Sequence, residues 1–173
     1  MERIRIAAIG CGNNMRGHLR RLLEMPEVEI VALVDPSEAS LQRTVEAFPS
    51  LKGLPVFADH RRMLEAIRPE AVVISTPHAF HHRQIMDSLE AGAHVQVEKP
   101  MVCSVQEALE VVAKWRETGK VVLVSYQRHT QPIYRKMKAM VEAGMLGTIT
   151  YVTCLQHQRW YRNQLAARQE GRG

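Results

Sequence analysis

The sequence predicts an α/β fold in which a mostly parallel, doubly wound β-sheet carries helices on both faces. Three observations predict it. Short apolar segments rich in β-branched residues alternate along the chain with amphipathic helical segments. The connections are short, and right-handed crossovers between parallel strands place the helices on both faces of a sheet. One segment, Ala71–Ile74, is apolar at every position, which is typical of a strand buried on both sides.

Each element has its own local signals. The predicted strands are Arg3–Ile9, Val28–Val34, Pro55–Phe57, Ala71–Ile74, Ala93–Val97 and Val121–Ser125. The predicted helices run from the first glycine turn to about Met25, and over Glu38–Phe48, Arg61–Ile67, Phe80–Ala91 and Ser104–Thr118. Ser37 is placed as a helix N-cap, Ser104 and Glu107 have the spacing of a capping box, and Gly92 stands where a helix ends.

The regular alternation weakens after about Gln127, which predicts a domain over 1–127 and the incomplete start of a second α/β domain over 128–173. The second part is expected to hold a helix over Pro132–Ala143, a strand over Gly147–Leu155 and a basic tail. That tail, residues 157–173, carries +3 of the net charge of +5. A solvated or unpaired tail is favoured over a nucleic-acid-binding arm, because no stripe of interleaved aromatic residues accompanies the charge.

Composition excludes several classes of protein. The 173 residues are 46% apolar and 24% charged, an ordinary globular balance. No run of eighteen apolar residues predicts a membrane span, and the first residues lack the apolar stretch of a signal peptide. The three cysteines are far apart and form no CxxC pair, so neither a zinc site nor a disulfide framework is indicated. We expect a protein of the reducing cytoplasm, with no nucleic-acid or membrane partner.

The turn after the first strand, Gly10 to Met15 (GCGNNM), predicts a phosphate-binding loop. Two glycines let the backbone turn tightly beside a pyrophosphate, and the following helix offers free N–H groups. Asp35 ends the second strand, where a carboxylate can bind the ribose hydroxyls of an adenosine and repel a 2′-phosphate, which favours NAD over NADP. A plain glycine-rich turn and a turn-initiating Asp-Pro remain the alternatives. Met15 replaces the third glycine of the GxGxxG pattern and is expected to push the helix outward, with Gly17 relieving the crowding.

Three longer segments resemble the glucose–fructose oxidoreductase/inositol dehydrogenase (Gfo/Idh/MocA) family. They are IAAIGCGNNMRGHL, VVISTPHAFHHRQIMDSLEAGAHVQVEKPM and SYQRHTQPIYRKMKAMVEAGMLGTITYV, and the Glu98-Lys99-Pro100 signature is the most distinctive part. The resemblance covers Ile4 to about Val152. It implies an N-terminal Rossmann domain that binds a nicotinamide dinucleotide, and a larger C-terminal α/β domain that covers a sugar- or polyol-like substrate and builds a homo-oligomer.

The resemblance also implies roles for individual residues. Lys99 is expected to act on the substrate hydroxyl, and Glu98 to contact the nicotinamide ribose. His81 is expected at the mouth of the helix beside the nicotinamide, and Gln127 at the border of the same pocket. The expected cofactor-binding set is Gly10, Gly12, Asn13, Asn14, Met15, Asp35, Ser75, Thr76, Pro77, His81, Glu98 and Gln127.

Chemistry supports the role of Lys99. Oxidation of a secondary alcohol moves a hydride to the nicotinamide while a proton leaves the oxygen, so the protein must orient the alcohol and accept the proton. A partly desolvated lysine beside a positively charged nicotinamide has its ammonium form disfavoured and becomes a better base. A solvated surface lysine is the alternative interpretation.

Other features limit these expectations. The histidines His78, His81, His82 and His94 predict no metal site, because adjacent helical residues point to different faces. The Asp-x-x-x-His pair usual in the family's second domain does not occur, and Arg128 is followed by His129 where the family often has two arginines. We therefore expect an NAD(P)-dependent oxidoreductase present as its nucleotide-binding part, with a non-catalytic NAD-binding sensor or scaffold module as the alternative.

Overall fold

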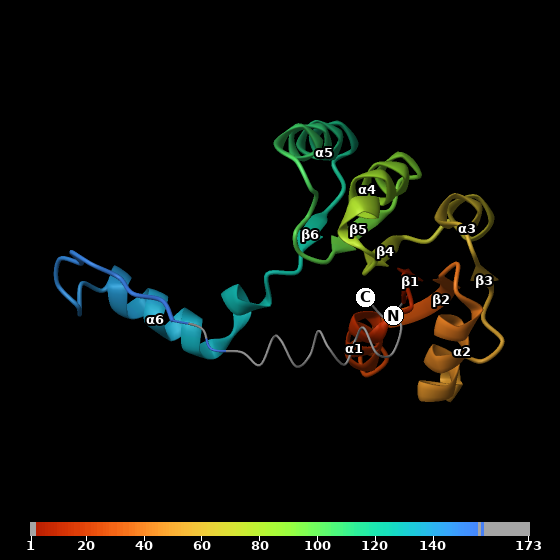
Figure 1. Cartoon of the computed structure of the whole chain (residues 1–173), viewed down its shortest axis with the longest axis horizontal. Helices are drawn as coiled ribbons and strands as arrows, with labels where there is room; N and C mark the ends of the chain where they lie inside the picture. The colour runs from red at the N-terminus through yellow and green to blue at the C-terminus, as the bar shows by residue number, and fades with distance from the viewer. Residues whose placement is uncertain (1–2, 156, 158–173) are drawn as a thin grey trace. The chain divides into compact units, whose positions relative to one another are not determined.

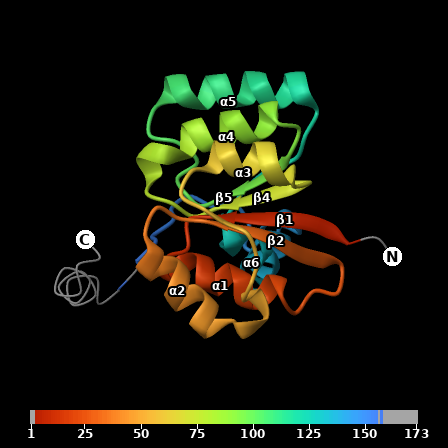
Figure 2. The same cartoon turned by 90° about the vertical axis from the view of Figure 1, so that its right-hand side faces the viewer.

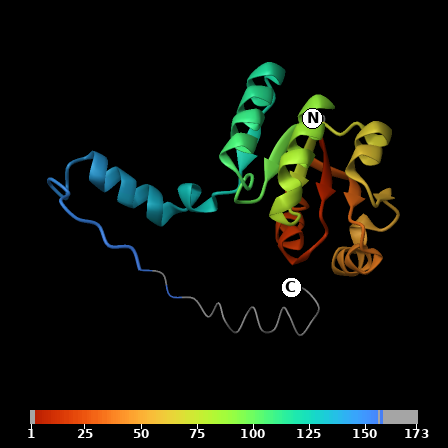
Figure 3. The ribbon, with the colours of Figure 1, turned by 45° about the horizontal axis from the view of Figure 1, so that its top comes forward.

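A computed structural model describes residues 3–155 and 157 of the chain. The chain divides into two compact units, Met1–Gln127 and Arg128–Gly173, which are described separately. The first unit is the predicted α/β fold, with a six-stranded sheet in the order β3-β2-β1-β4-β5-β6 whose paired strands are all parallel. The parallel course of β1 and β2, in red and orange, can be followed in Figure 3.

The observed elements of the first unit lie within a few residues of the predicted ones (Figure 1). The strands are β1 Ile4–Ile9, β2 Val28–Val34, β3 Val56–Phe57, β4 Ala71–Ile74, β5 His94–Val97 and β6 Val122–Val124. The α-helices are α1 Asn13–Leu22, α2 Glu38–Ala47, α3 His60–Ile67, α4 His81–Glu90 and α5 Val105–Thr118. Short 3₁₀ helices cover Pro49–Leu51 (η1) and His78–Phe80 (η2).

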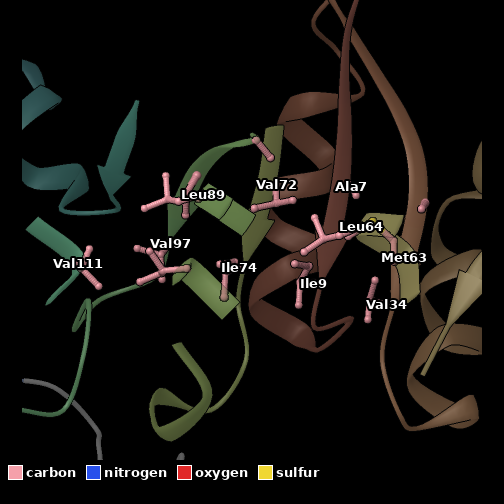
Figure 4. Close-up of a cluster of buried hydrophobic side chains, with 14 residues drawn as sticks. Ala7, Ile9, Val34, Met63, Leu64, Val72, Ile74, Leu89, Val97 and Val111 are labelled. Carbon is pink, nitrogen blue, oxygen red and sulfur yellow. The ribbon is translucent and has the colours of Figure 1, made fainter. Parts of the chain in front are cut away.

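The helices cover both faces of the sheet, and each face has its own apolar core. Figure 2 shows α3, α4 and α5 on one face and α1 and α2 on the other. Under the first group lies a cluster that includes Ile9, Val72, Ile74 and Val97, drawn in Figure 4. Under the second lies a cluster that includes Ala8, Met15 and Leu33. Because neighbouring residues of a strand face opposite sides, Val72 and Val73 of one strand belong to different cores.

Local capping fixes where the helices begin. The Ser37 hydroxyl accepts a hydrogen bond from Ser40 N at 3.3 Å, as expected for the N-cap of α2. Ser104 and Glu107 form the predicted capping box at the start of α5, with side chain and backbone bonded in both directions. Asp59 caps α3 by accepting from the backbone N–H groups of its first turn.

In the second unit the helix prediction is confirmed and the strand prediction is wrong. The 3₁₀ helix η3 (Gln127–Thr130) leads into α6, which covers Pro132–Glu142. Residues 147–155, expected as a strand, form no strand, and their side chains are exposed. A strand is held by hydrogen bonds to a neighbouring strand, and the described residues of this unit offer none. The predicted basic tail falls, but for residue 157, outside the described residues.

None of the helices in the described part of the chain is both long and apolar enough to cross a membrane.

Candidate cofactor-binding site

The candidate site lies at the carboxyl edge of the sheet, where β1 and its neighbour β4 end. The chain leads from β1 to β2 and β3 on one side and later to β4, β5 and β6 on the other, so the strand order reverses between β1 and β4. Ligands of open α/β sheets bind at such a reversal. Gly10 leaves β1 there with φ +87°, and a Cβ on it would stand 2.6 Å from Ser75 O. Only glycine fits between these two strand ends.

The start of α1 presents free backbone donors to this edge. Gly12 is the N-cap residue, no side chain caps the helix, and no acidic residue lies in its first turn. Nothing lies within 4 Å of the position that a Cβ on Gly12 would take. The Arg16 guanidinium turns back, donates to Cys11 O at 3.1 Å and also bonds the Asn13 side chain. Open amides, a helix N-terminus and a nearby cation are the features that bind anions in proteins.

Asp35, at the end of β2, is bonded to this loop. Its Oδ2 accepts from Cys11 N at 2.7 Å, and its Oδ1 accepts from Ser37 N at 2.8 Å. The second bond closes a turn at Asp35-Pro36, which is the alternative interpretation of Asp35 given by the sequence. The first one ties the carboxylate to the phosphate loop, and each carboxylate oxygen retains further acceptor capacity. Asp35 is therefore both a turn residue and a carboxylate placed beside the loop.

Cys11 gives the loop a rigid base. Its side chain is completely buried, and Thr44 of α2 donates from Oγ1 to Cys11 O at 3.0 Å. Burial, together with the negative charge of Asp35, raises the pKa of the Cys11 thiol to about 12. The thiol is therefore a neutral packing group. The backbone of Cys11 holds the loop, because its N–H donates to Asp35 and its carbonyl accepts from Thr44.

A second polar group lies at the ends of β4 and β5. Asn14 Nδ2 donates to Ser75 Oγ at 3.2 Å, which connects α1 to the end of β4. Glu98, after β5, bonds His18 Nε2 through Oε1 at 2.8 Å and accepts from Lys99 N through Oε2 at 3.2 Å. Burial raises the pKa of Glu98, but hydrogen bonds from His18, Asn14 and Lys99 N outweigh it, so the pKa is lowered. Glu98 is thus held as an anion.

His81 connects the two loops that follow β4 and β5. Its ring is completely buried, with Nδ1 2.9 Å from Pro100 O and Nε2 3.0 Å from Thr76 O. Thr76 also donates from Oγ1 to Gln84 Oε1 at 2.6 Å. Because both ring nitrogens of His81 face protein carbonyls, this side chain orients the loops and presents no surface to a ligand.

Most of the predicted site residues come together at this edge. The glycine loop, Asp35, Ser75 and Glu98 are connected directly or through Asn14 by the bonds above. Pro77 and Lys99 are exposed on the two loops, and Gln127 begins η3 shortly after β6. Among the described residues, no three His, Cys, Asp or Glu side chains are grouped so that they could hold a metal ion.

Met15 lies between α1 and the sheet, and the expectation that Gly17 relieves crowding there is wrong. Its side chain is completely buried in the cluster under α1, in the same cluster as the small Ala8 of β1. It therefore fills the core between helix and sheet. Gly17 has no atom within 4 Å of where its Cβ would stand, so it relieves no crowding.

His18, Gln96 and Ser125 belong to none of the sequence motifs, yet hydrogen bonds connect them in a row that starts at Glu98. His18 Nδ1 lies 3.5 Å from Gln96 Nε2, and Gln96 Nε2 donates to Ser125 Oγ at 3.3 Å. One signal was available. His18 follows Asn14 by four residues, so both lie on the same face of α1.

Fold and site together define a dinucleotide-binding α/β protein of the Rossmann type. Comparison with known families agrees: residues 4–126 match the model of an oxidoreductase family with an NAD-binding Rossmann fold. The chain belongs to this family, Gfo/Idh/MocA.

Individual relatives cover most of this chain. D-glucoside 3-dehydrogenase of Escherichia coli K12 is 30% identical over 151 residues, which are 87% of this chain and 42% of the relative. Glycosyl hydrolase family 109 protein 2 of Akkermansia muciniphila is 32% identical over 91% of this chain and 36% of the relative. Scyllo-inositol dehydrogenase of Lactobacillus casei, solved with NAD(H) and scyllo-inositol, superposes with a TM-score of 0.79 at 25% identity, over 86% of this chain and 44% of that one. The chain thus spans less than half the length of these relatives.

Proposed function

We propose that this chain binds NAD and is the nucleotide-binding part of an oxidoreductase that transfers hydride between nicotinamide and a secondary alcohol of a sugar or polyol. The single observation that carries the proposal is the uncapped start of α1 beside Asp35, at the reversal of strand order. The open space at Gly12 fits a pyrophosphate, and the amides of the first helical turn are donors without a side-chain cap.

Each part of the site has a role in this proposal. The amides of Asn13, Asn14 and Met15 hold the pyrophosphate. Asp35 accepts the adenosine ribose hydroxyls with its remaining lone pairs and repels a 2′-phosphate. The loops after β4 and β5 border the nicotinamide, with Ser75, Thr76 and Pro77 on one side and Glu98 on the other. His81 takes part through these loops and Gln127 borders the pocket.

Bound NAD supplies the hydride acceptor. In the overall reaction the alcohol carbon loses a hydride, its hydroxyl loses a proton, and a ketone remains. Lys99 follows Glu98 on the exposed edge, and its amine is the group proposed to accept that proton. Glu98 is held by His18 and by Lys99 N, so it orients this loop and keeps its negative charge.

The substrate class rests on the relatives, which include sugar and inositol dehydrogenases as well as a protein named as a glycosyl hydrolase. This chain matches less than half the length of each of them, so the substrate remains part of the proposal. We also propose a homo-oligomer for the full-length form. The three free cysteines support a reducing cytoplasm as its compartment.

Titration calorimetry of the full chain with NAD⁺ and NADP⁺ tests the proposal. Asp35→Asn retains an acceptor for the loop but removes the charge, and it should weaken NAD⁺ about tenfold, the loss of one charged hydrogen bond, while NADP⁺ binding is unchanged or tighter. Gly12→Ala should weaken both cofactors, because its Cβ stands in the pyrophosphate space. Gly17→Ala, on the same helix, is the matched control and should leave both affinities unchanged.

Two results would contradict the proposal. The first is a folded parent chain that binds neither NAD⁺ nor NADP⁺. The second is an equal loss for both cofactors on Asp35→Asn, which would remove the carboxylate from ribose recognition.

A further inference from the structure

The His18–Glu98 pair connects α1 to the residue that precedes Lys99. Its atoms His18 Nε2 and Glu98 Oε1 are 2.8 Å apart, and the two side chains are 14% and 16% exposed. Both Glu98 oxygens are bonded, since Oε2 accepts from Lys99 N and the Asn14 side chain donates to the carboxylate as well. The Glu98 carboxylate is therefore held in position by three neighbours, His18, Asn14 and the backbone N–H of Lys99.

The surroundings of His18 suit both of its protonation states. The Gln96 amide nitrogen is a donor, and neutral His18 can accept from it at Nδ1 while Nε2–H donates to Glu98. Rotation of that amide by half a turn presents its oxygen to a protonated Nδ1. Ser125, which now accepts from the Gln96 amide nitrogen, can donate to that oxygen instead. The Gln96 amide oxygen can therefore accept a hydrogen bond from a proton gained at His18 Nδ1.

The groups that face His18 come from three elements. The loop after β5 contributes Glu98, β5 contributes Gln96, and Ser125 follows β6. Asn14 on α1 shares the Glu98 carboxylate. Within the described residues, Glu98 is the charged group bonded to His18, so the charge of the pair is −1 with neutral His18 and zero with protonated His18.

We propose that His18 is a positioning residue for Glu98 whose protonation sets how strongly the site prefers oxidised over reduced nicotinamide dinucleotide. This inference rests on the proposed cofactor site. The nicotinamide ring carries a positive charge in NAD⁺ and none in NADH. A pair with charge −1 attracts the oxidised ring, and protonation of His18 cancels that attraction. Histidine is the side chain that ordinarily changes charge between pH 5 and 8. The preference for NAD⁺ therefore rises with pH.

The experiment measures the dissociation constants of NAD⁺ and NADH for the full chain between about pH 6 and about pH 8.5, the range in which histidine changes charge. Their ratio cancels every effect at the shared adenosine and pyrophosphate. We expect Kd(NADH)/Kd(NAD⁺) to rise at least about fivefold, the lower end of coupling between two sites. His18→Gln retains a donor for Glu98 but cannot change charge, so its ratio should not vary with pH.

His60→Gln is the matched control. His60 Nε2 bonds Asp87 Oδ2 at the same 2.8 Å, with side chains 12% and 23% exposed, between α3 and α4 on the opposite face of the sheet. This variant should retain the parent's dependence on pH. Should His18→Gln fail to fold, calorimetry of the parent in two buffers of different ionisation enthalpy counts the protons exchanged. NADH binding should then retain more protons than NAD⁺ binding.

The outcomes separate the two proposals. If neither cofactor binds, the proposed function is overturned and this inference with it. If both bind with a ratio that does not vary with pH, or with equal proton counts, only the role of His18 is overturned. A dependence on pH that persists in His18→Gln overturns it as well.

Discussion

Replacing Gly10 with alanine should destabilise the first unit more than any other single methyl added to the glycine loop. Gly10 lies between two strands. Its N–H donates to Val34 O at 2.7 Å on the β2 side. On the β4 side, a Cβ would meet Ser75 O at 2.6 Å, Thr76 Cγ2 at 2.8 Å and Ser75 C at 2.9 Å. Two of these three atoms belong to the backbone, so the strand ends themselves would have to separate.

Two costs add up in Gly10→Ala. An L-residue at φ +87° is strained by about 1–2 kcal/mol, and forcing a methyl into a filled space costs about 1–3 kcal/mol. The expected loss is therefore about 2–5 kcal/mol, a large part of the roughly 5–15 kcal/mol by which folded proteins are stable. Urea denaturation followed by circular dichroism measures it from the midpoint and the slope.

The other two glycines of this segment provide the comparison. Neither Gly12 nor Gly17 has an atom within 4 Å of its would-be Cβ, and neither has a positive φ. Gly17→Ala, inside α1, should stabilise the protein by about 0.5–1 kcal/mol, because alanine is the better helix former. If Gly10→Ala stays within about 0.5 kcal/mol of the parent, the range of an ordinary surface substitution, then β1 and β4 do not approach as closely as described.

Three further predictions concern buried or paired groups. Met15→Ala should lower the free energy of unfolding by about 2–5 kcal/mol in the same urea assay, because it opens a cavity in the core under α1. A loss below about 1 kcal/mol would contradict the packing of Met15 in that core. Glu98 has a lowered pKa, so its stabilising contribution is complete above the ordinary value of 4.5 and is lost as the pH falls through the folded value. The stability difference between parent and Glu98→Gln should therefore shrink in acid, and a constant difference would show that the charge is not stabilised. The Cys11 thiol should resist iodoacetamide at pH 8 until the protein unfolds. The other two cysteines are exposed and should react in the native state. Equal reaction rates for all three thiols would refute the burial of Cys11.

The elements of the first unit could be predicted because their signals are local. The capping box at Ser104 and Glu107 and the apolar run Ala71–Ile74 each act within a few residues, and the structure confirms both. The predicted strand at residues 147–155 failed for the opposite reason. Its apolar residues suit a strand, but a strand also needs a partner, and no local pattern shows whether one exists.

The candidate site likewise contains residues with a local sequence signal and residues that only the fold brings together. Gly10, Gly12 and Asp35 form a motif whose spacing is fixed by the loop and strand they occupy, so the sequence reveals it. His18 and Glu98 are 80 positions apart, and only the pairing of α1 with the end of β5 brings them together. The burial of His81 and Met15 could not be predicted from the sequence either. A position in a motif does not show whether the side chain or the backbone of that residue faces the ligand.

The contacts described at the cofactor edge all lie within the first unit. Asp35 is bonded to Cys11 and Ser37, Glu98 to His18, and Asn14 to Ser75, so the donors and acceptors proposed for NAD are fixed without residues 128–173. Preorganised groups of this kind bind with a smaller ordering cost. The proposed turnover requires more, because oxidation of an alcohol at the exposed Lys99 also needs groups that orient the alcohol and exclude water. Cofactor affinity and turnover are therefore separable in this chain, and the first unit alone should account for the first of them.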